Sequence, residues 1–375
     1  MRIVAVQTGL SPHSVLGGTI TDREVLTRIA QRGIEVHVLA EHGEPIVEHP
    51  GIFHHFWKPK IRRCLAPLID AIPYSGNLDV ARELRSLFRS IGPVDWVRFN
   101  SPYSVGIGAA LAIDHSRLWG SYLHMEDYLP WKWIDGWLPA KCDLITCLCE
   151  DTRNDLIERC PRANHGRNIV VPMGIDVRQL DNAGPSRSDV RRSLGFADDD
   201  VVALFVGVLI PRKGIVDLVA AWKLLEQNTH ARLLIVGRPL SRNESGLVAE
   251  LTAADHRVRH LETVPYEQRG AYFRASDIFV FPTHLEGFGI VVGEAMACGL
   301  PVLTTRAKGV RTVVVENETA LVTNVGDPAR FAHQLHRLIA DPALRQRLGA
   351  AGRQRIAEHF QWDRITSSLV QALQT

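Results

Sequence analysis

Short apolar runs alternate with longer amphipathic stretches along this chain, and the whole alternation occurs twice. In the first half, strand-like runs lie at residues 3–6, 36–39, 94–99, 118–123, 144–148 and 169–171. In the second half, the corresponding runs lie at residues 202–208, 233–236, 258–261, 278–281, 302–304 and 321–323. Helical periodicity separates several of them. In residues 21–33, Val25, Leu26 and Ile29 share one helical face, and Gly33 ends the helix.

Strands that alternate with helices predict parallel sheets covered by helices on both faces. Two such series in 375 residues predict two doubly wound α/β domains. We expect the boundary within residues 170–189, where Pro172, Gly174, Gly184 and Pro185 interrupt any helical periodicity. Because open parallel sheets bind ligands beyond the carboxyl ends of their strands, a cleft between the domains is the expected binding site.

Composition narrows the class of protein. A hydrophobic content of 46% with 22% charged residues indicates a globular protein, and a net charge of +2 gives no general attraction to nucleic acid. The first apolar run starts without a charged-then-apolar leader, and the run at 201–210 is too short to cross a bilayer. We therefore expect a cytoplasmic protein with reduced thiols. The spacing of Cys142, Cys147, Cys149 and Cys160 fits no common zinc pattern and favours core cysteines over a metal site.

Residues 205–214, FVGVLIPRKG, form the first candidate for chemistry. A buried strand leads through Gly207 to the adjacent cations Arg212 and Lys213, which Gly214 follows. Cations at the carboxyl end of a strand can clamp a diphosphate and stabilise it as an anionic leaving group. The alternative interpretation is a solvated loop pair.

Residues 286–301, EGFGIVVGEAMACGLP, form the second candidate. We expect a buried helix whose start leaves the amides of Phe288, Gly289 and Ile290 open to phosphate. If the helix were continuous from Glu286 to Glu294, these carboxylates would lie about 12 Å apart along its axis. That separation exceeds the roughly 5 to 9.5 Å of a glycosidase pair.

An extended ligand suits such a spacing better, with sugar hydroxyls at Glu286 and ribose hydroxyls at Glu294. The alternative for Glu294 is a buried acid that pairs with an arginine such as Arg306. A third segment, residues 235–240, ends a strand at Gly237 and places Arg238 after it, where the loop could approach a nucleotide base or ribose.

The second half resembles the GT-B glycosyltransferases, specifically the retaining enzymes of family four. Residues 205–214, 286–302 and 317–335 are similar to successive landmarks of that family, and 171–176 resembles its inter-domain crossing. The resemblance implies two Rossmann-like domains that face each other across a cleft. Residues 1–172 would bind the acceptor and residues 173–360 the donor, with a helix at about 361–375 crossing back onto the first domain.

The resemblance also implies roles for particular residues. Arg212 and Lys213 would hold the donor diphosphate, Glu286 the donor sugar and Glu294 the ribose, with Gly207 and Gly237 lining the donor site. In the first half, Gly17 and Gly18 resemble the family's glycine-rich loop near the donor phosphate or the acceptor, and His124 resembles its cleft histidine. Two departures concern donor identity: residues 306–313, RAKGVRTV, replace the usual Gly-Gly-Ile-Pro-Glu, and Arg238 replaces an acid.

These roles imply a hexosyltransferase that uses a UDP- or GDP-sugar, with the leaving phosphate accepting the proton of the acceptor. Positioning and electrostatic stabilisation then suffice, without a cofactor or metal. The ADDD stretch at 197–200 is interpreted as a turn. We expect Arg212→Ala or Lys213→Ala to abolish most activity with little effect on thermal melting. Other GT-B-type enzymes, such as a phosphorylase or a sugar-nucleotide epimerase, and a non-catalytic GT-B binding subunit are the alternatives.

The acceptor, a glycan, a lipid-linked sugar or a small molecule, is less defined. Residues 52–65 combine aromatic residues with Lys58, Lys60, Arg62 and Arg63, which suits a phosphorylated acceptor, peripheral contact with the inner face of an anionic membrane, or a charged connecting loop. The segment 128–139 contains Trp131, Trp133 and Trp137, which suit either an acceptor platform or core packing.

Overall fold

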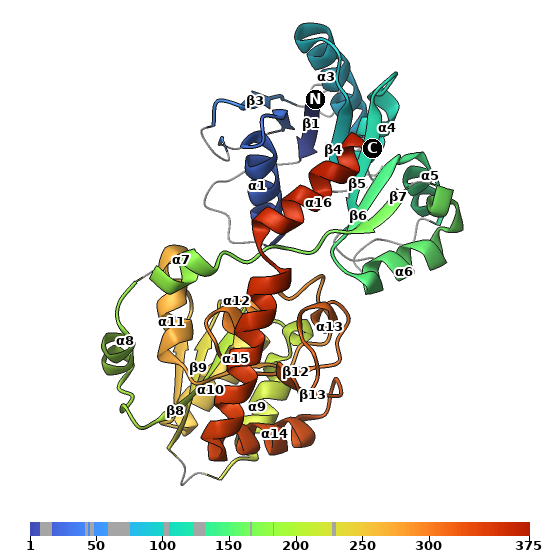
Figure 1. The fold of residues 1–375 in the computed structure, drawn as a ribbon. Helices are drawn as coiled ribbons and strands as arrows, with labels where there is room; N and C mark the ends of the chain where they lie inside the picture. Colours follow the sequence, from blue (N-terminus) through green and yellow to red (C-terminus); the bar gives the residue numbers. More distant parts are fainter. Residues whose placement is uncertain are drawn as a thin grey trace. The chain divides into compact units, whose positions relative to one another are not determined.

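The computed structural model describes residues 1–7, 17–41, 44–45, 49–58, 76–100, 105–122, 132–165, 167–182, 184–226 and 230–375. The chain forms two compact units (Figure 1). Unit 1 comprises Met1–Pro172 and Ile365–Thr375, and unit 2 comprises Met173–Arg364. Among the described helices, none combines the length and the apolar character that crossing a bilayer requires.

Unit 1 contains a seven-stranded parallel sheet with the order β3-β2-β1-β4-β5-β6-β7. Its strands are β1 (Arg2–Gln7), β2 (Glu35–Ala40), β3 (Ile52–Phe56), β4 (Trp96–Phe99), β5 (Arg117–Tyr122), β6 (Leu144–Cys147) and β7 (Arg167–Val170). Its helices include α1 (Gly17–Ala30), α3 (Gly76–Ile91), α4 (Ile107–Ala112), α5 (Lys132–Lys141) and α6 (Glu150–Arg159), with the 3₁₀ helix η2 (Pro161–His165).

The last helix, α16 (Trp362–Gln374), starts in unit 2 and ends in unit 1. Within unit 1, the carbonyl of Leu373 accepts a hydrogen bond of 3.0 Å from Trp96 Nε1 in β4. The carbonyl of Ala372 accepts one of 2.5 Å from Arg167 Nη2 in β7. The end of α16 therefore completes unit 1 by bonding to two of its strands.

Unit 2 contains a six-stranded parallel sheet with the order β10-β9-β8-β11-β12-β13. Its strands are β8 (Val201–Val206), β9 (Ala231–Val236), β10 (Val258–Leu261), β11 (Ile278–Phe281), β12 (Val302–Thr305) and β13 (Ala320–Thr323). The longer helices are α7 (Val177–Asn182), α8 (Arg187–Leu194), α9 (Ile215–Lys223), α10 (Arg242–Ala254), α11 (Arg269–Ala275), α12 (Ile290–Ala297), α14 (Pro328–Ala340) and α15 (Pro342–His359). The short ones are η3 (Pro211–Lys213), η4 (Tyr266–Gln268) and α13 (Val310–Val313).

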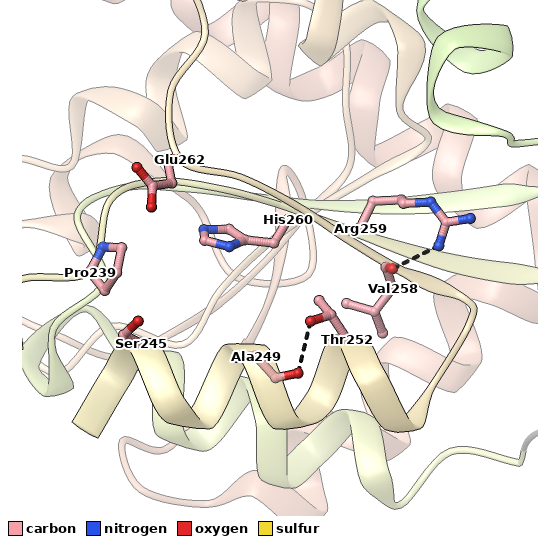
Figure 2. A pocket seen from close by; sticks show the side chains of 8 residues that line it. All are labelled: Pro239, Ser245, Ala249, Thr252, Val258, Arg259, His260 and Glu262. Atoms are coloured by element: carbon pink, nitrogen blue, oxygen red, sulfur yellow. Dashed lines mark hydrogen bonds between the residues drawn. The ribbon is translucent and has the colours of Figure 1, made fainter. Parts of the chain in front are cut away.

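The strand order of unit 2 reverses between β8 and β11. From β8 the chain proceeds to β9 and β10 on one side, and from β11 to β12 and β13 on the other. Loops that leave two neighbouring strands in opposite directions open a crevice at their carboxyl ends, which is where such sheets bind ligands. A separate open groove of about 440 Å³ lies between α10 and the edge strand β10, lined by side chains that include Ser245, His260 and Glu262 (Figure 2).

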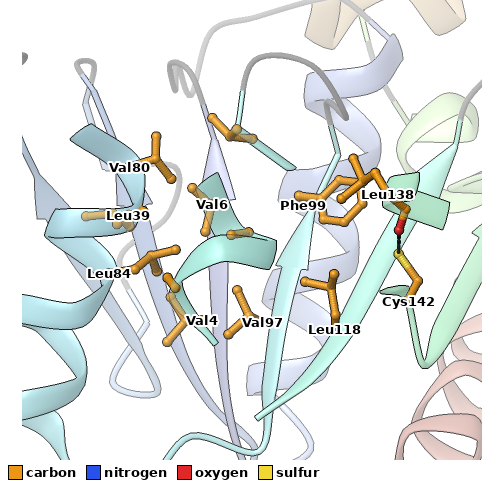
Figure 3. Close-up of a cluster of buried hydrophobic side chains, with 14 of the residues drawn as sticks. Val4, Val6, Leu39, Val80, Leu84, Val97, Phe99, Leu118, Leu138 and Cys142 are labelled. Carbon is orange, nitrogen blue, oxygen red and sulfur yellow. Dashed lines mark hydrogen bonds between the residues drawn. The ribbon is translucent and has the colours of Figure 1, made fainter. Parts of the chain in front are cut away.

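One face of the unit 1 sheet carries a cluster of buried apolar side chains (Figure 3). Val4 of β1, Val97 of β4 and Leu118 of β5 belong to it, together with Val80 and Leu84 of α3. The helix α3 is amphipathic, so burying this stripe holds it on the sheet while its polar face stays in water.

Four cysteines that are close in the sequence are buried free thiols: Cys142, Cys147, Cys149 and Cys160. Cys142 and Cys147 belong to the apolar cluster of unit 1, and Cys142 Sγ donates to the carbonyl of Leu138 at 3.4 Å (Figure 3). Cys147 ends β6, whereas Cys149 lies beyond the strand and caps α6 by accepting from the amide of Thr152. Burial raises the pKa of the Cys147 thiol to about 12.

The predicted fold class is confirmed: each of the twelve expected runs overlaps a strand of the two parallel sheets. The helix expected at 21–33 is α1, and Gly33 follows it with φ of 78°. The turn expected at 197–200 precedes β8. The sequence interpretation missed β3, an edge strand inside the segment 52–65.

Candidate functional site

The predicted cations lie at the point where the strand order of unit 2 reverses. Arg212 and Lys213 belong to η3, which connects β8 to α9, and Glu286 lies in the loop from β11 to α12. Because β8 and β11 are neighbours, the fold brings together groups that are 73 residues apart in the chain. The two segments that the sequence singled out therefore form one site in unit 2.

Glu286 is held by two donors. Lys213 Nζ lies 2.5 Å from Glu286 Oε1, and the hydroxyl of Thr283 donates to the same oxygen at 3.1 Å. The Glu286 side chain is only 8% exposed, so its charge depends on Lys213 for compensation. Within the described part of the chain, the second carboxylate oxygen has no hydrogen-bond partner and is left for a ligand.

Arg212 differs from Lys213 in having no acidic partner among the described residues. Within the described part of the chain, its only side-chain hydrogen bond is a 3.3 Å contact from Nη1 to the carbonyl of Leu285. A half-buried guanidinium with most of its donors unused is suited to an anionic ligand, because it binds two oxygens in one plane.

The backbone fixes these cations in place. The carbonyl of Arg212 accepts from the amide of His284 at 2.8 Å. Gly214, the residue after the cations, has φ of 78°, and a β-carbon there would lie 1.9 Å from the carbonyl oxygen of Pro282. Only glycine combines this backbone conformation with such a close approach. The η3 turn is thus pressed against the loop that carries Glu286.

A second pair supports the same contact. His284 Nε2 lies 2.7 Å from Asp217 Oδ2 in the first turn of α9. Sequence reasoning missed Thr283, His284 and Asp217. Their position could have indicated them, because Thr283 and His284 follow a buried strand almost directly. In a doubly wound sheet, ligand-binding polar residues lie at the carboxyl ends of the strands.

The helix after Glu286 starts later than expected. It begins at Ile290, after Gly289 with φ of 85°, so the continuous helix considered from the sequence is wrong and its 12 Å spacing does not apply. The cause is glycine at 287 and 289, which lets the chain turn before the helix starts. No side chain caps α12, and within the described residues the amides of Phe288, Gly289 and Ile290 have no acceptor. Uncapped amides at a helix start are suited to an anion, so this helix start keeps the character that the sequence predicted.

Glu294 lies in the second turn of α12 and is 6% exposed. Arg269 Nε donates to its Oε1 at 2.8 Å. The alternative drawn from the sequence, a buried acid paired with an arginine, is thus confirmed, but the arginine is Arg269 and not Arg306, which pairs with Glu316 at 2.6 Å. Burial raises the pKa of Glu294, and the Arg269 guanidinium opposes that rise.

The other predicted residues are distributed over both units. Gly207 and Gly237 follow β8 and β9, and Arg238 is exposed. Gly17 and Gly18 are the first residues of α1. His124 lies outside the described residues, as do Lys60, Arg62, Arg63 and Trp131. Lys58 and Trp137 are exposed.

The start of α1 is tied to the sheet of unit 1 by a polar network that the sequence interpretation missed. Asp22 of α1 pairs with Arg98 of β4, and both side chains are 3% exposed. Asn100 also donates to Asp22, and Gln7 does so at 3.3 Å. The order of the strands in unit 1 reverses between β1 and β4, so this network fixes the first turns of α1 beside that reversal.

Solved structures share this architecture. A sucrose-phosphate synthase from Thermosynechococcus elongatus aligns with a TM-score of 0.80 at 22% identity, covering 100% of this chain and 98% of that chain. Anabaena Alr3699/HepE in complex with UDP and glucose aligns with a TM-score of 0.79 at 20% identity, covering 100% and 99%. At such identities the likeness shows the fold alone, which is the two-unit GT-B fold of glycosyltransferases.

Sequence comparisons give the family. The model of the family "Glycosyl transferases group 1" matches residues 186–355, and that of "Glycosyltransferase Family 4" matches residues 17–179. The chain belongs to the group 1 glycosyltransferases.

Two curated relatives are informative. D-inositol 3-phosphate glycosyltransferase of Geodermatophilus obscurus is 35% identical over 246 residues, which is 62% of this chain and 52% of the relative. A GDP-mannose-dependent monoacylated alpha-(1-6)-phosphatidylinositol monomannoside mannosyltransferase of Corynebacterium glutamicum is 33% identical over 214 residues, 55% of each chain. The matched part of the chain thus spans about half the length of these relatives.

Proposed function

We propose that this glycosyltransferase is a retaining enzyme that moves a hexose from a nucleotide-diphosphate sugar to a hydroxyl acceptor. The observation that carries the proposal is Arg212. This guanidinium lacks an acidic partner among the described residues, and it lies at the strand-order reversal beside Lys213 and Glu286. A cation held in place without compensation is suited to a diphosphate that gains charge as its bond to the sugar breaks.

Each group has a role in this scheme. Arg212 and Lys213 bind the diphosphate together with the amides at the start of α12, and the unpaired oxygen of Glu286 accepts from sugar hydroxyls. Glu294 accepts from the ribose. The bond from the anomeric carbon to phosphate oxygen breaks, a bond to the acceptor oxygen forms on the same face, and the acceptor proton passes to the departing phosphate. His124 remains a predicted group near the anomeric carbon.

The names of the relatives support a nucleotide donor of the UDP or GDP class. One similar structure contains UDP and glucose, and one curated relative is GDP-mannose-dependent. Two curated relatives are named for acceptors built on inositol phosphate or phosphatidylinositol. For this chain we propose a polyol or lipid-linked acceptor bound by unit 1. We also propose peripheral membrane contact through the segment that contains Lys58, and a cytoplasmic location.

We further propose that the reaction needs no metal, since two cations and open amides supply the charge that a metal would otherwise provide. Activity that is lost in EDTA and restored by Mg²⁺ or Mn²⁺ would contradict this part of the proposal.

A thermal-shift screen against UDP, GDP, ADP and their sugars tests the donor directly. We expect one nucleotide class to raise the melting temperature of wild type and to lose that effect in Arg212→Ala. A protein that none of these ligands stabilises, and that transfers no sugar, would refute the proposed function. The anomeric configuration of the product, read by NMR, then tests retention.

A further inference from the structure

We propose that Arg269 is a positioning residue for Glu294: it holds one oxygen of this buried carboxylate, keeps the group anionic, and leaves the other oxygen for a ribose diol. This inference rests on the proposed function, because it assigns the ligand of Glu294 to a nucleotide. It concerns a residue that neither the sequence motifs nor the comparisons assign.

Arg269 is itself held from several directions. It starts α11, and its Nη1 donates to the carbonyl of Tyr266 at 2.7 Å while its Nη2 donates to Gln179 Oε1 at 3.3 Å. The guanidinium carbon lies 3.7 Å from the centre of the Tyr266 ring. With the bond from Nε to Glu294, every nitrogen of the guanidinium has a partner, so the side chain is fixed rather than free to leave the acid.

Glu294 has only this one hydrogen-bond partner among the described residues, and the bond uses Oε1. Among the described residues, Oε2 of this 6% exposed residue has no hydrogen-bond partner. A carboxylate with one fixed and one open oxygen presents its acceptor lone pairs in a defined direction. A pair of adjacent hydroxyls can donate to such an oxygen.

The charged groups around Cys298, one helical turn after Glu294, are engaged elsewhere. Arg274 of α11 donates to the carbonyl of Leu180, and Arg353 of α15 pairs with Asp181 of α7 at 2.8 Å. Cys298, which follows α12, lies within electrostatic range of Glu294, but burial raises the pKa of its thiol to about 12 and keeps it neutral. Arg269 is therefore the cation on which the ionisation of Glu294 depends.

Removing Arg269 changes a measurable quantity with a definite sign. Burial already raises the pKa of Glu294, and without the guanidinium that pKa rises further. At low pH the group is then a neutral acid and a weaker acceptor for the diol, whereas at high pH it becomes a carboxylate again. Loss of an anionic acceptor corresponds to about a tenfold to hundredfold weaker affinity.

The experiment is a calorimetric titration of UDP, GDP and ADP into wild type, Arg269→Met and Arg269→Lys at pH 6, 7, 8 and 9. The ratio of mutant to wild-type Kd at each pH cancels the titration of the nucleotide. For Arg269→Met we expect a ratio of about 10 to 100 at pH 6 that falls as pH rises. For Arg269→Lys, which keeps the charge, we expect a ratio near one.

Arg274→Met is the matched control, because it removes a neighbouring arginine of the same helix that does not bond to Glu294, and we expect its ratio to stay near one. The double variant Arg269→Met with Glu294→Gln should bind weakly, and its ratio of mutant to wild-type Kd should be the same at every pH. If Arg269→Met does not fold, Arg269→Gln takes its place in the same titration.

A ratio for Arg269→Met that is flat across pH, or a pH dependence that survives Glu294→Gln, would overturn the role of Arg269 while leaving the nucleotide site standing. Wild type that binds none of the three nucleotides would overturn the proposed function and this inference together.

Discussion

Arg212 and Lys213 are adjacent in the chain, yet the structure predicts that their removal affects stability differently. Arg212→Ala removes one long hydrogen bond from a half-buried guanidinium and leaves no charge unpaired. We expect a loss of about 0 to 1 kcal/mol in the free energy of unfolding. Turnover should nevertheless fall about a hundred- to a thousandfold, the typical cost of removing a donor aimed at developing charge.

Lys213→Ala leaves Glu286 with a single neutral donor, Thr283. Breaking a buried ion pair costs about 3 to 5 kcal/mol, and because the Lys213 side chain is 20% exposed we expect about 2 to 4 kcal/mol. For a unit of this size the melting temperature should fall by roughly 5 to 15 °C. The structure thus revises the expectation, drawn from the sequence, that both variants melt like wild type.

Differential scanning fluorimetry and initial rates of transfer from the donor identified in the screen check both variants. The double variant Lys213→Ala with Glu286→Gln is the control: without a buried charge to leave unpaired, it should recover much of the melting temperature but none of the turnover. The reasoning is refuted if Lys213→Ala melts like wild type, or if either single variant turns over at the wild-type rate.

Three further outcomes follow from the described contacts. Gly214→Ala should lower the free energy of unfolding by about 2 to 5 kcal/mol in urea melts, because it combines a left-handed conformation with overpacking; wild-type stability would contradict the close approach. Arg257 hydrogen-bonds to Asp255 and lowers its pKa to about 2, below the unfolded value, so this stabilisation is complete above about pH 4 and disappears as pH falls towards 2. Asp255→Asn should therefore cost about 1 to 2 kcal/mol at pH 7 and progressively less in melts at pH 4 and pH 3, whereas a gap that stays constant would refute the assignment. The Cys147 thiol, with its pKa raised to about 12 by burial, should resist iodoacetamide at pH 8 until urea is added, and rapid labelling of its peptide in the native protein would show that it is accessible.

The sequence predicted the layers of the fold because buried parallel strands are nearly continuous apolar runs, which can be recognised locally. The edge strand β3 lacks that signal. Of its five residues only Ile52 is buried, and Phe53 and Phe56 are 44% and 46% exposed. This edge strand is defined by its pairing with β2 alone, and five residues do not reveal which strand they pair with.

For the candidate site, the sequence identified individual residues but not the contacts between them. Motif spacing identified Arg212, Lys213 and Glu286, but the strand order that makes β8 and β11 neighbours came from the structure. Spacing could not show that Lys213 and Glu286 bond to each other, or that Arg269 rather than Arg306 reaches Glu294. These contacts depend on how α11, α12 and β12 lie in three dimensions, and the sequence around each residue carries no record of its distant partner.

The path of α16 bears on how the protein is made. Unit 2 is one uninterrupted stretch, but unit 1 also includes Ile365–Thr375, which follow unit 2 in the sequence and bond to β4 and β7. During synthesis, domains generally fold as units from the N-terminus onward. Ile365–Thr375 are synthesised after unit 2, so unit 2 can fold before the first-made part of unit 1 has all its residues. A chain truncated before residue 365 would keep all of unit 2 but lack the segment of unit 1 that bonds to β4 and β7.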